Sequence, residues 1–150
     1  MASGKLDAIE AARNVFKSIA GSPYRTNIQN RVYSRFYTPT EQPDIEKPWG
    51  VLQQLEPSAY EEPGNSQSRI WRMEAWFFFD ENAESDPLNT AAERACHDFE
   101  DDVREAFIVD PRLNNTALRC NLISVNPIYG DTDDYAKVHV VLEIEQELEA

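Results

Sequence analysis

The sequence is poor in glycine and cysteine, and both shortages limit the chemistry that it can support. It has five glycines in 150 residues, and none of them belongs to a phosphate-binding loop or to a Gly-x-Ser-x-Gly turn around a serine nucleophile. The two cysteines, Cys96 and Cys120, are each expected on the apolar face of a separate element. We therefore expect two buried free thiols and a protein that folds in reducing cytosol.

Long apolar runs and an excess of basic residues are also missing. No stretch approaches the roughly 18–20 apolar residues of a membrane-spanning helix, and no apolar run follows a basic residue near the start. Neither a membrane segment nor a signal peptide is predicted. With 14 basic and 27 acidic residues the formal charge is −13, which argues against nucleic-acid binding through phosphate neutralisation.

The charged residues are unevenly distributed along the chain. Residues 11–40 carry five basic residues and no acidic one, whereas residues 80–110 carry eleven acidic residues and two arginines. Oppositely charged patches on one protein can steer copies head to tail, and they can equally be ordinary solvated faces. The candidates for a subunit contact in these two segments are Arg31, Arg35, Asp98, Asp101 and Asp102.

Two segments have the apolar period of amphipathic helices, at about residues 4–20 and 87–108. The second can begin at Asp86 and Pro87 or at Thr90, and Pro111 ends it because the residue before a proline is pushed out of the helical region. One side of the first collects Leu6, Ile9, Ala12, Phe16 and Ile19, and one side of the second collects Ala92, Ala95, Cys96, Phe99, Val103, Ala106 and Phe107.

Strand patterns occupy most of the remaining chain, in residues 28–38, 49–55, 70–79, 118–125 and 135–148. The last strand alternates aliphatic residues with charged ones, and its glutamates would protect a sheet edge from unwanted pairing. Residues 70–79 are apolar on both faces. They predict either a central strand covered on both sides or a strand whose second face, with Ile70, Trp76 and Phe78, meets another subunit.

The order of these elements predicts one α+β domain over residues 1–150. We expect a two-layer sandwich in which two helices pack on a mainly antiparallel or mixed sheet of four to five strands. Residues 39–48 contain three prolines and, like residues 56–68, are expected to be loops. Neither loop divides the chain, because the residues on either side could not form a core alone.

No catalytic, metal or cofactor site is predicted, and the chain is not expected to be an enzyme. The spacing of His97 and Asp101 predicts a pair on the solvent-exposed face of their helix. A metal site there would need more ligands, and the sequence offers none beside them. His139 projects from the charged face of the last strand without a nucleophile beside it. Residues 131–134 resemble the start of a calcium loop but lack the required glycine, so they predict a polar turn. The strand face formed by Arg31, Tyr33, Arg35 and Tyr37 could stack single-stranded nucleic acid, or it could be an ordinary strand face or a subunit contact.

The layout of elements is similar to that of the tail terminator, or tail-completion, proteins of long-tailed bacteriophages and related neck ring proteins. An N-terminal helix and strand precede a proline-entered strand at residues 48–52, and a long hydrophobic strand follows. An acidic helix then ends in the segment Ala106 to Leu113, which contains the Asp-Pro-x-Leu pattern of that family. In that family a glycine often follows the leucine of this pattern, whereas this sequence has Asn114 and Asn115 there. The terminal strand alternates valines and glutamates.

The resemblance implies a structural protein without chemistry, located in the virion at the junction of tail and neck after assembly in the host cytoplasm. Copies would close into a hexameric ring on the tail tube protein, and the other ring surface would meet the head-completion or connector protein. Double-stranded DNA would pass through without specific binding, along a wall that includes Asp131, Asp133 and Asp134. Two alternatives remain, a different head–tail connector or minor capsid ring protein of the same fold, and a monomeric protein-binding module.

Overall fold

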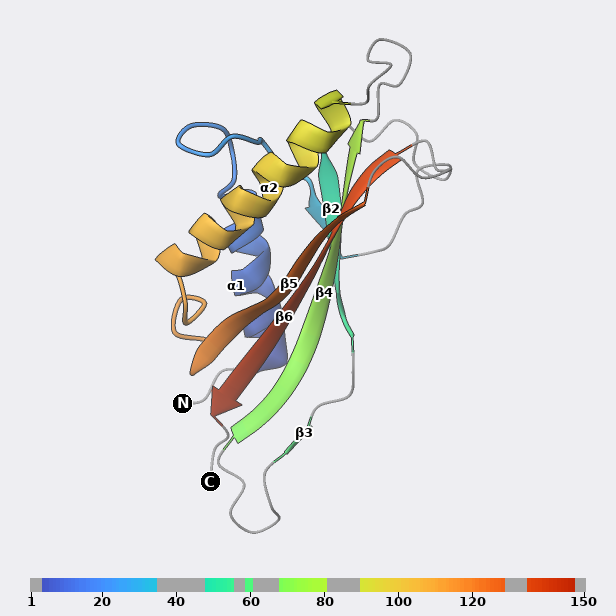
Figure 1. Cartoon of the computed structure of the whole chain (residues 1–150). Helices are drawn as coiled ribbons and strands as arrows, with labels where there is room; N and C mark the ends of the chain where they lie inside the picture. Colours follow the sequence, from blue (N-terminus) through green and yellow to red (C-terminus); the bar gives the residue numbers. More distant parts are fainter. Residues whose placement is uncertain are drawn as a thin grey trace.

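Two helices cover one face of a long, twisted sheet (Figure 1). The computed structural model describes residues 4–34, 48–55, 59–60, 68–80, 90–128 and 135–147. Their elements, in chain order, are α1 (Lys5–Lys17), β1 (Val32–Tyr33), β2 (Trp49–Gln54), β3 (Ala59–Tyr60), β4 (Ser68–Asp80), α2 (Thr90–Val109), β5 (Arg119–Ile128) and β6 (Tyr135–Glu147). This architecture confirms the α+β fold class.

The sheet is mixed, with strand order β1-β2-β4-β6-β5 and the short β3 paired separately with β4. Only β1 and β2 run parallel; the other described pairs are antiparallel. β4 and β6 pair along their whole length, from Ser68 with Glu147 to Asp80 with Tyr135. These two long strands form the centre of the sheet, so the expectation that the β6 glutamates protect an edge is wrong.

Alternation of side chains decides which face of β4 and β6 meets the helices. In β6 the aliphatic residues from Ala136 to Ile144 are buried at every second position, as the sequence predicts. On the helix side, the Phe77 ring of β4 lies 4.8 Å from Phe16 of α1 and 4.6 Å from Phe99 of α2. The aromatic rings therefore hold both helices to the same strand.

Gly50 in β2 is required by the same aromatic packing. A Cβ atom built at this position would overlap the Phe77 ring. Any larger residue would push the β2 backbone away from β4, because Gly50 and Phe77 are direct partners in the ladder. The glycine thus allows β2 to pair closely with β4 beside the Phe77 ring.

The segment after α2 is a compact turn that returns the chain to the sheet. The Asp110 carboxylate accepts a hydrogen bond from the Asn114 backbone N–H at 2.8 Å, and the Pro111 carbonyl accepts one from the Cys120 N–H at 3.0 Å. Leu113 is fully buried although its φ is +48°, a conformation that favours glycine or asparagine. Burial of this leucine fixes the turn at the end of the helix.

Several sequence expectations differ from the structure at the ends of elements. Leu6 was expected on the buried side of the first helix, but it is 68% exposed, because Ala8 and Ala12 take the buried positions of that end. The strand expected at 28–38 is a two-residue edge strand, β1, within the described part of the chain. The expected loops at 39–48 and 56–68 lie largely outside the described residues, as does the Asp86 helix start. The second expected loop does contain the short strand β3, which pairs with β4.

Candidate functional site

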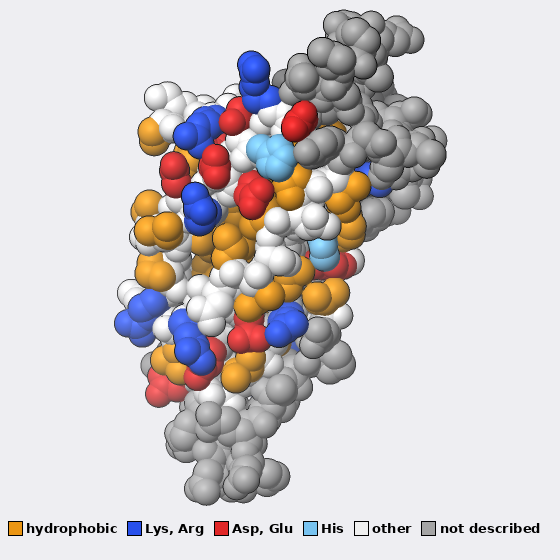
Figure 2. Space-filling view, viewed as in Figure 1, with side chains coloured by type: hydrophobic (Ala, Val, Ile, Leu, Met, Phe, Trp, Pro, Cys, Tyr) orange, Lys and Arg blue, Asp and Glu red, His pale blue; other side chains and the backbone are white. Residues whose placement is uncertain are grey.

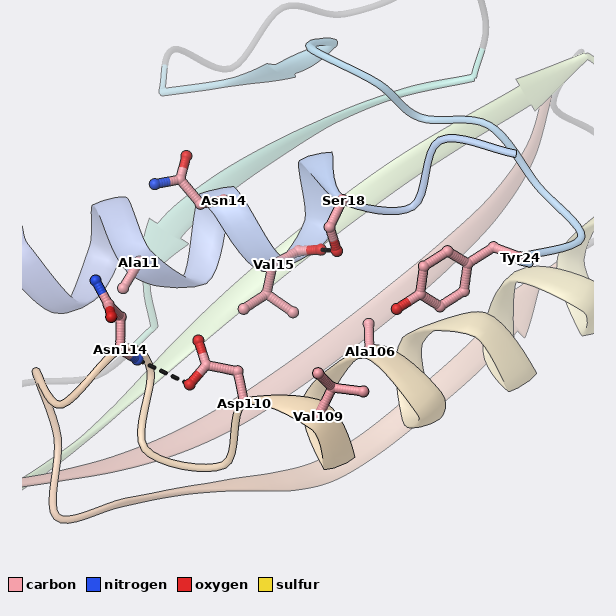
Figure 3. Close-up of a pocket in the computed structure, with 9 residues that line it drawn as sticks. All are labelled: Ala11, Asn14, Val15, Ser18, Tyr24, Ala106, Val109, Asp110 and Asn114. Atoms are coloured by element: carbon pink, nitrogen blue, oxygen red, sulfur yellow. Dashed lines mark hydrogen bonds between the residues drawn. The ribbon is translucent and has the colours of Figure 1, made fainter. Parts of the chain in front are cut away.

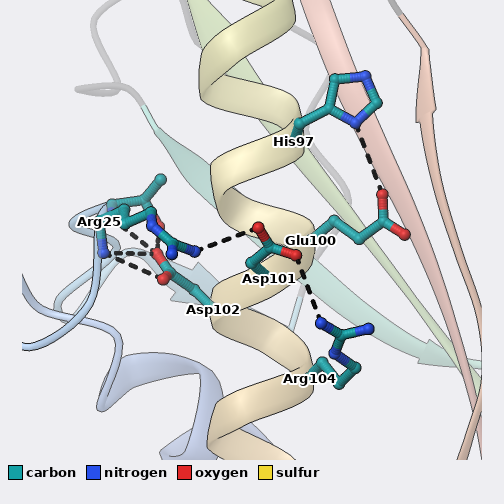
Figure 4. A network of polar contacts seen from close by, with 7 residues as sticks. Arg25, His97, Glu100, Asp101, Asp102 and Arg104 are labelled. Atoms are coloured by element: carbon teal, nitrogen blue, oxygen red, sulfur yellow. Dashed lines mark hydrogen bonds and ion pairs between the residues drawn. The ribbon is translucent and has the colours of Figure 1, made fainter.

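Asp102 of α2 accepts several hydrogen bonds from the N-terminal part of the chain. Its side chain is 1% exposed, and its two carboxylate oxygens accept from the backbone N–H of Arg25, each at 3.0 Å (Figure 4). One oxygen also accepts from the Thr26 N–H at 2.7 Å and from the Thr26 hydroxyl at 2.6 Å. This carboxylate therefore binds the loop after α1 to α2, which is a structural role in a single copy.

The neighbouring charged residues form a more exposed network on the same helix. The Arg25 guanidinium lies 3.1 Å from Asp101, and Arg104 lies 3.7 Å from the other oxygen of that carboxylate. His97 lies 3.7 Å from Glu100 rather than beside Asp101, which corrects the expected pair (Figure 4). Because Arg25 pairs with Asp101 within one copy, the basic and acidic segments partly neutralise each other before any neighbour is present.

A second buried polar residue, Gln146 in β6, was not singled out from the sequence. Its amide oxygen accepts from Trp71 Nε1 at 3.0 Å and from the Arg69 guanidinium at 3.0 and 3.1 Å. Its amide nitrogen donates to the carbonyls of Gly4 and Thr116, each at 3.0 Å. The strict alternation of β6 indicates that position 146 faces inward, but only the fold brings the five partner atoms around it.

The sheet face that points away from the helices carries a polar row across three strands. His139 of β6 stacks on Trp76 of β4, with ring centroids 4.2 Å apart, and its Nε2 lies 2.8 Å from Glu74. Glu74 also accepts from Gln53 of β2. This arrangement orients a histidine with a carboxylate, and within the described residues it places no serine or cysteine next to that histidine in the β-ladder.

A groove of about 480 Å³ separates α1 from the end of α2 (Figure 3). Tyr24 and Asp110 supply its polar groups, together with Ser18 and two asparagines. The Ser18 hydroxyl donates to the Val15 carbonyl at 2.5 Å, and Asp110 already caps the turn after α2. Both groups thus serve local structure, and the groove presents no activated nucleophile among the described residues.

A smaller groove of about 360 Å³ lies between α2 and β5, and we call it the α2–β5 groove. Its lining is largely apolar and consists of Arg104, Phe107, Ile108, Pro111, Cys120, Asn121 and Leu122. Burial, with a smaller contribution from the nearby Asp110 carboxylate, raises the pKa of the Cys120 thiol to about 12. At neutral pH the Cys120 thiol that lines this groove is therefore protonated and weakly nucleophilic.

Most exposed aliphatic side chains belong to the segment that runs from the end of α2 into β5. Of the six large hydrophobic residues exposed in the described part of the chain, four lie between positions 108 and 123. Ile108 and Val109 are the most exposed of all, at 70% and 78%. Figure 2 shows hydrophobic side chains spread across the middle of one face, with charged groups above and below them. A surface of this kind indicates a contact with another molecule.

The residues predicted for a subunit contact differ in burial and in the contacts that they make within one copy. Asp102 is buried, and Phe78 is 5% exposed and stacked on Trp49 at 4.6 Å, so we assign both to the fold of one copy. Arg31 donates to the carbonyls of Pro48 and Asn27 at 2.8 and 2.7 Å. The half-buried Ile70, Trp76, Asp98 and Asp101 stay predictions, whereas Arg35, Asp131, Asp133 and Asp134 lie outside the described residues.

Comparison with known proteins does not assign the chain to a family. No protein-family model matches the chain, and no curated protein matches its sequence. Across the described ranges, no three histidine, cysteine, aspartate or glutamate side chains are grouped as metal ligands would be. None of the described helices combines the length and apolar character of a membrane span. The largely apolar lining of the α2–β5 groove and the exposed Ile108 make this groove the candidate functional site.

Proposed function

We propose that this protein is a phage tail terminator, a structural virion protein whose copies form a ring on the end of the tail tube. The ring caps the tube and joins it to the head–neck connector, and DNA passes through its centre. The work of such a protein is contact rather than catalysis. Its functional residues are then those that meet a neighbouring copy, the tube or the connector.

The observation that carries this proposal is the order of elements together with the segment that ends α2. An N-terminal helix, the strands β1 to β4, an acidic helix and the strands β5 and β6 follow each other in the order that the resemblance implies. The Asp-Pro-x-Leu segment has a physical role in this order: Asp110 caps the turn and the buried Leu113 anchors it. The pattern therefore belongs to the turn that connects α2 to β5.

Surface properties are consistent with a ring component. Ile108 and Val109 lose little exposure within one copy, so burying them against a neighbour would remove apolar area from water, at about 25 cal/mol per Å². The formal charge of −13 repels DNA, which suits a channel that the genome crosses without sticking. A different ring protein of the head–tail junction would need the same two properties, and its partners would set it apart.

Solution mass tests the proposal directly. Light scattering is measured over a range of protein and salt concentrations, with and without added tail tubes. We expect either a ring-sized species, which for six copies of a 17.2 kDa chain is about 100 kDa, or a monomer that assembles when tubes are added. A monomer that ignores tail tubes under all conditions refutes the ring and favours a monomeric binding module.

A further inference from the structure

The groove between α1 and the end of α2 changes from apolar to acidic along its length (Figure 3). Val15 of α1 and Val109 of α2 line its middle, and the Asp110 carboxylate lies at one end with Asn114 beside it. Tyr24 lies toward the other end, and its hydroxyl points to the middle. The volume of about 480 Å³ is within the roughly 300–1,000 Å³ of pockets that hold small ligands. The groove is therefore large enough for one extended side chain of a partner.

The acidic end of this groove carries a charge that the described part of the chain does not balance. Asp110 directly follows the last residue of α2, where the helix dipole contributes roughly half a negative charge, and the last turn of α2 has no basic residue. Its Oδ1 accepts from the Asn114 N–H at 2.8 Å, but a neutral amide does not cancel the charge. Asp110 forms no ion pair with any described lysine or arginine. This end of the groove therefore attracts a cation.

The middle of the groove offers apolar surface directly before that charge. Val109 is 78% exposed, the highest value among the large hydrophobic residues that the structure describes. Val15 and Ala106, which line the same groove, are packed at 7% and 2% exposure. Lysine and arginine side chains have an apolar stem that ends in a cation, which is the order of features that this groove complements. The Tyr24 hydroxyl, which has no hydrogen-bond partner among the described residues, is available to the main chain of such a residue.

We propose that this groove binds a lysine or arginine side chain that a different protein presents. The ammonium or guanidinium head pairs with Asp110, the methylene stem covers Val109, and the Tyr24 hydroxyl donates to a main-chain carbonyl of the partner. The formal charge of −13 favours a basic partner, whereas a second copy brings the same acidic charge. The inference goes beyond the proposed ring and does not depend on it, because the occupant is not another copy.

Titration of the protein with amino-acid derivatives, followed by amide resonances in NMR spectra, tests this site. The probes are N-acetyl-arginine amide and N-acetyl-lysine amide, and N-acetyl-citrulline amide is the neutral control of nearly the same shape as the arginine probe. A salt concentration of about 0.15 M screens attraction beyond roughly 8 Å. We expect a Kd on the order of 1 mM for the cationic probes, with the largest shifts around Val15, Val109 and Asn114. The citrulline probe should bind about 10-fold more weakly.

Three variants locate the binding energy. Asp110→Asn keeps an oxygen for the Asn114 N–H but removes the charge, and it should weaken the cationic probes about 10-fold. Tyr24→Phe removes only the hydroxyl and should weaken them about two- to fivefold. Glu105→Gln is the matched control, because Glu105 is an exposed acid of the same helix that does not line the groove. It should leave the Kd unchanged.

Equal affinities for the arginine and citrulline probes overturn the inference, and so do equal losses in Asp110→Asn and Glu105→Gln, because binding would then follow overall charge. Tighter binding of 1,4-diaminobutane than of either amino-acid probe overturns the assignment to a protein side chain. Light scattering on Asp110→Asn separates this site from the ring: we expect an unchanged mass, and loss of an oligomer would show that a second copy fills the groove instead. A wild-type monomer that binds the cationic probes refutes the ring and supports the site.

Discussion

Replacing Asp102 tests whether this buried carboxylate holds the loop after α1 against α2. In Asp102→Ala, two backbone N–H groups and the Thr26 hydroxyl lose their acceptor inside a packed region. Hydrogen bonds to a charged group are each worth about 1.5–3 kcal/mol, and water recovers part of the loss. We expect the free energy of unfolding to fall by about 3–5 kcal/mol, comparable to breaking a buried charge pair.

Urea unfolding followed by tryptophan fluorescence measures this change. Trp49 and Trp71 are buried at 0% and 1% exposure, so their emission reports global unfolding. For a chain of this size, the loss corresponds to a fall of about 6–20 °C in Tm. Asp102→Asn keeps one acceptor oxygen and the same shape, and we expect it to cost about half as much.

Asp101→Ala is the matched control, one position away on the same helix. Asp101 is 46% exposed, and its two ion pairs face solvent, so its removal should cost no more than about 1 kcal/mol. Equal stability losses for the two alanine variants would refute the reasoning, because burial and the number of donors would then have no effect. Hydrogen exchange gives a local check, since the Arg25 and Thr26 amides should exchange faster in Asp102→Ala alone.

Three further predictions concern single residues. Gly50→Ala places a Cβ against the Phe77 ring and should destabilise the protein by about 1–3 kcal/mol; an unchanged urea midpoint would mean that β2 moves freely. Gln146→Leu leaves the partners of its amide unpaired and should cost about 2–4 kcal/mol, against less than about 0.5 for Gln53→Leu on the exposed face. Burial raises the pKa of the Cys120 thiol from 9.0 to about 12, so at pH 8 the folded protein should react with iodoacetamide at Cys120 about 10³-fold more slowly than the urea-unfolded protein. The rate in the folded protein should still rise between pH 9 and 11. Equal rates for the folded and unfolded protein at pH 8 would contradict the burial of this thiol.

The acidic and basic segments illustrate a limit of charge counting along a chain. The uneven charge along the sequence allows either a contact between oppositely charged patches of different copies or ordinary solvated faces, but Arg25 meets Asp101 within the same copy. Residues 76 positions apart become neighbours because the loop after α1 packs against α2. Segment charge therefore overstates the charge that is available to a partner.

The periodicity of the sequence alone determined three features. These are the helix α2, which ends just before Asp110 and Pro111, the inward face of β6, and the two-layer α+β class. These features depend on local geometry, because a side-chain period of two or of 3.6 residues decides which positions share a face. The same period wrongly predicts a buried Leu6, which is 68% exposed because Ala8 and Ala12 take the buried positions at that end of α1.

Only the tertiary structure decided the roles of Asp102 and Gln146 and the existence of the α2–β5 groove. Each depends on atoms from segments far apart in the chain: the Asp102 carboxylate meets a loop 76 residues away, and Gln146 meets Gly4 across 142. An acidic residue on a helix and a glutamine in a strand are ordinarily solvated; the alternation of β6 indicates the inward face of position 146, but no local pattern identifies the hydrogen-bond partners of either residue. Burial is a property of the packed chain. It makes Asp102 the acceptor that binds the loop after α1 to α2, and it makes Gln146 a link between the sheet, the start of α1 and the turn before β5.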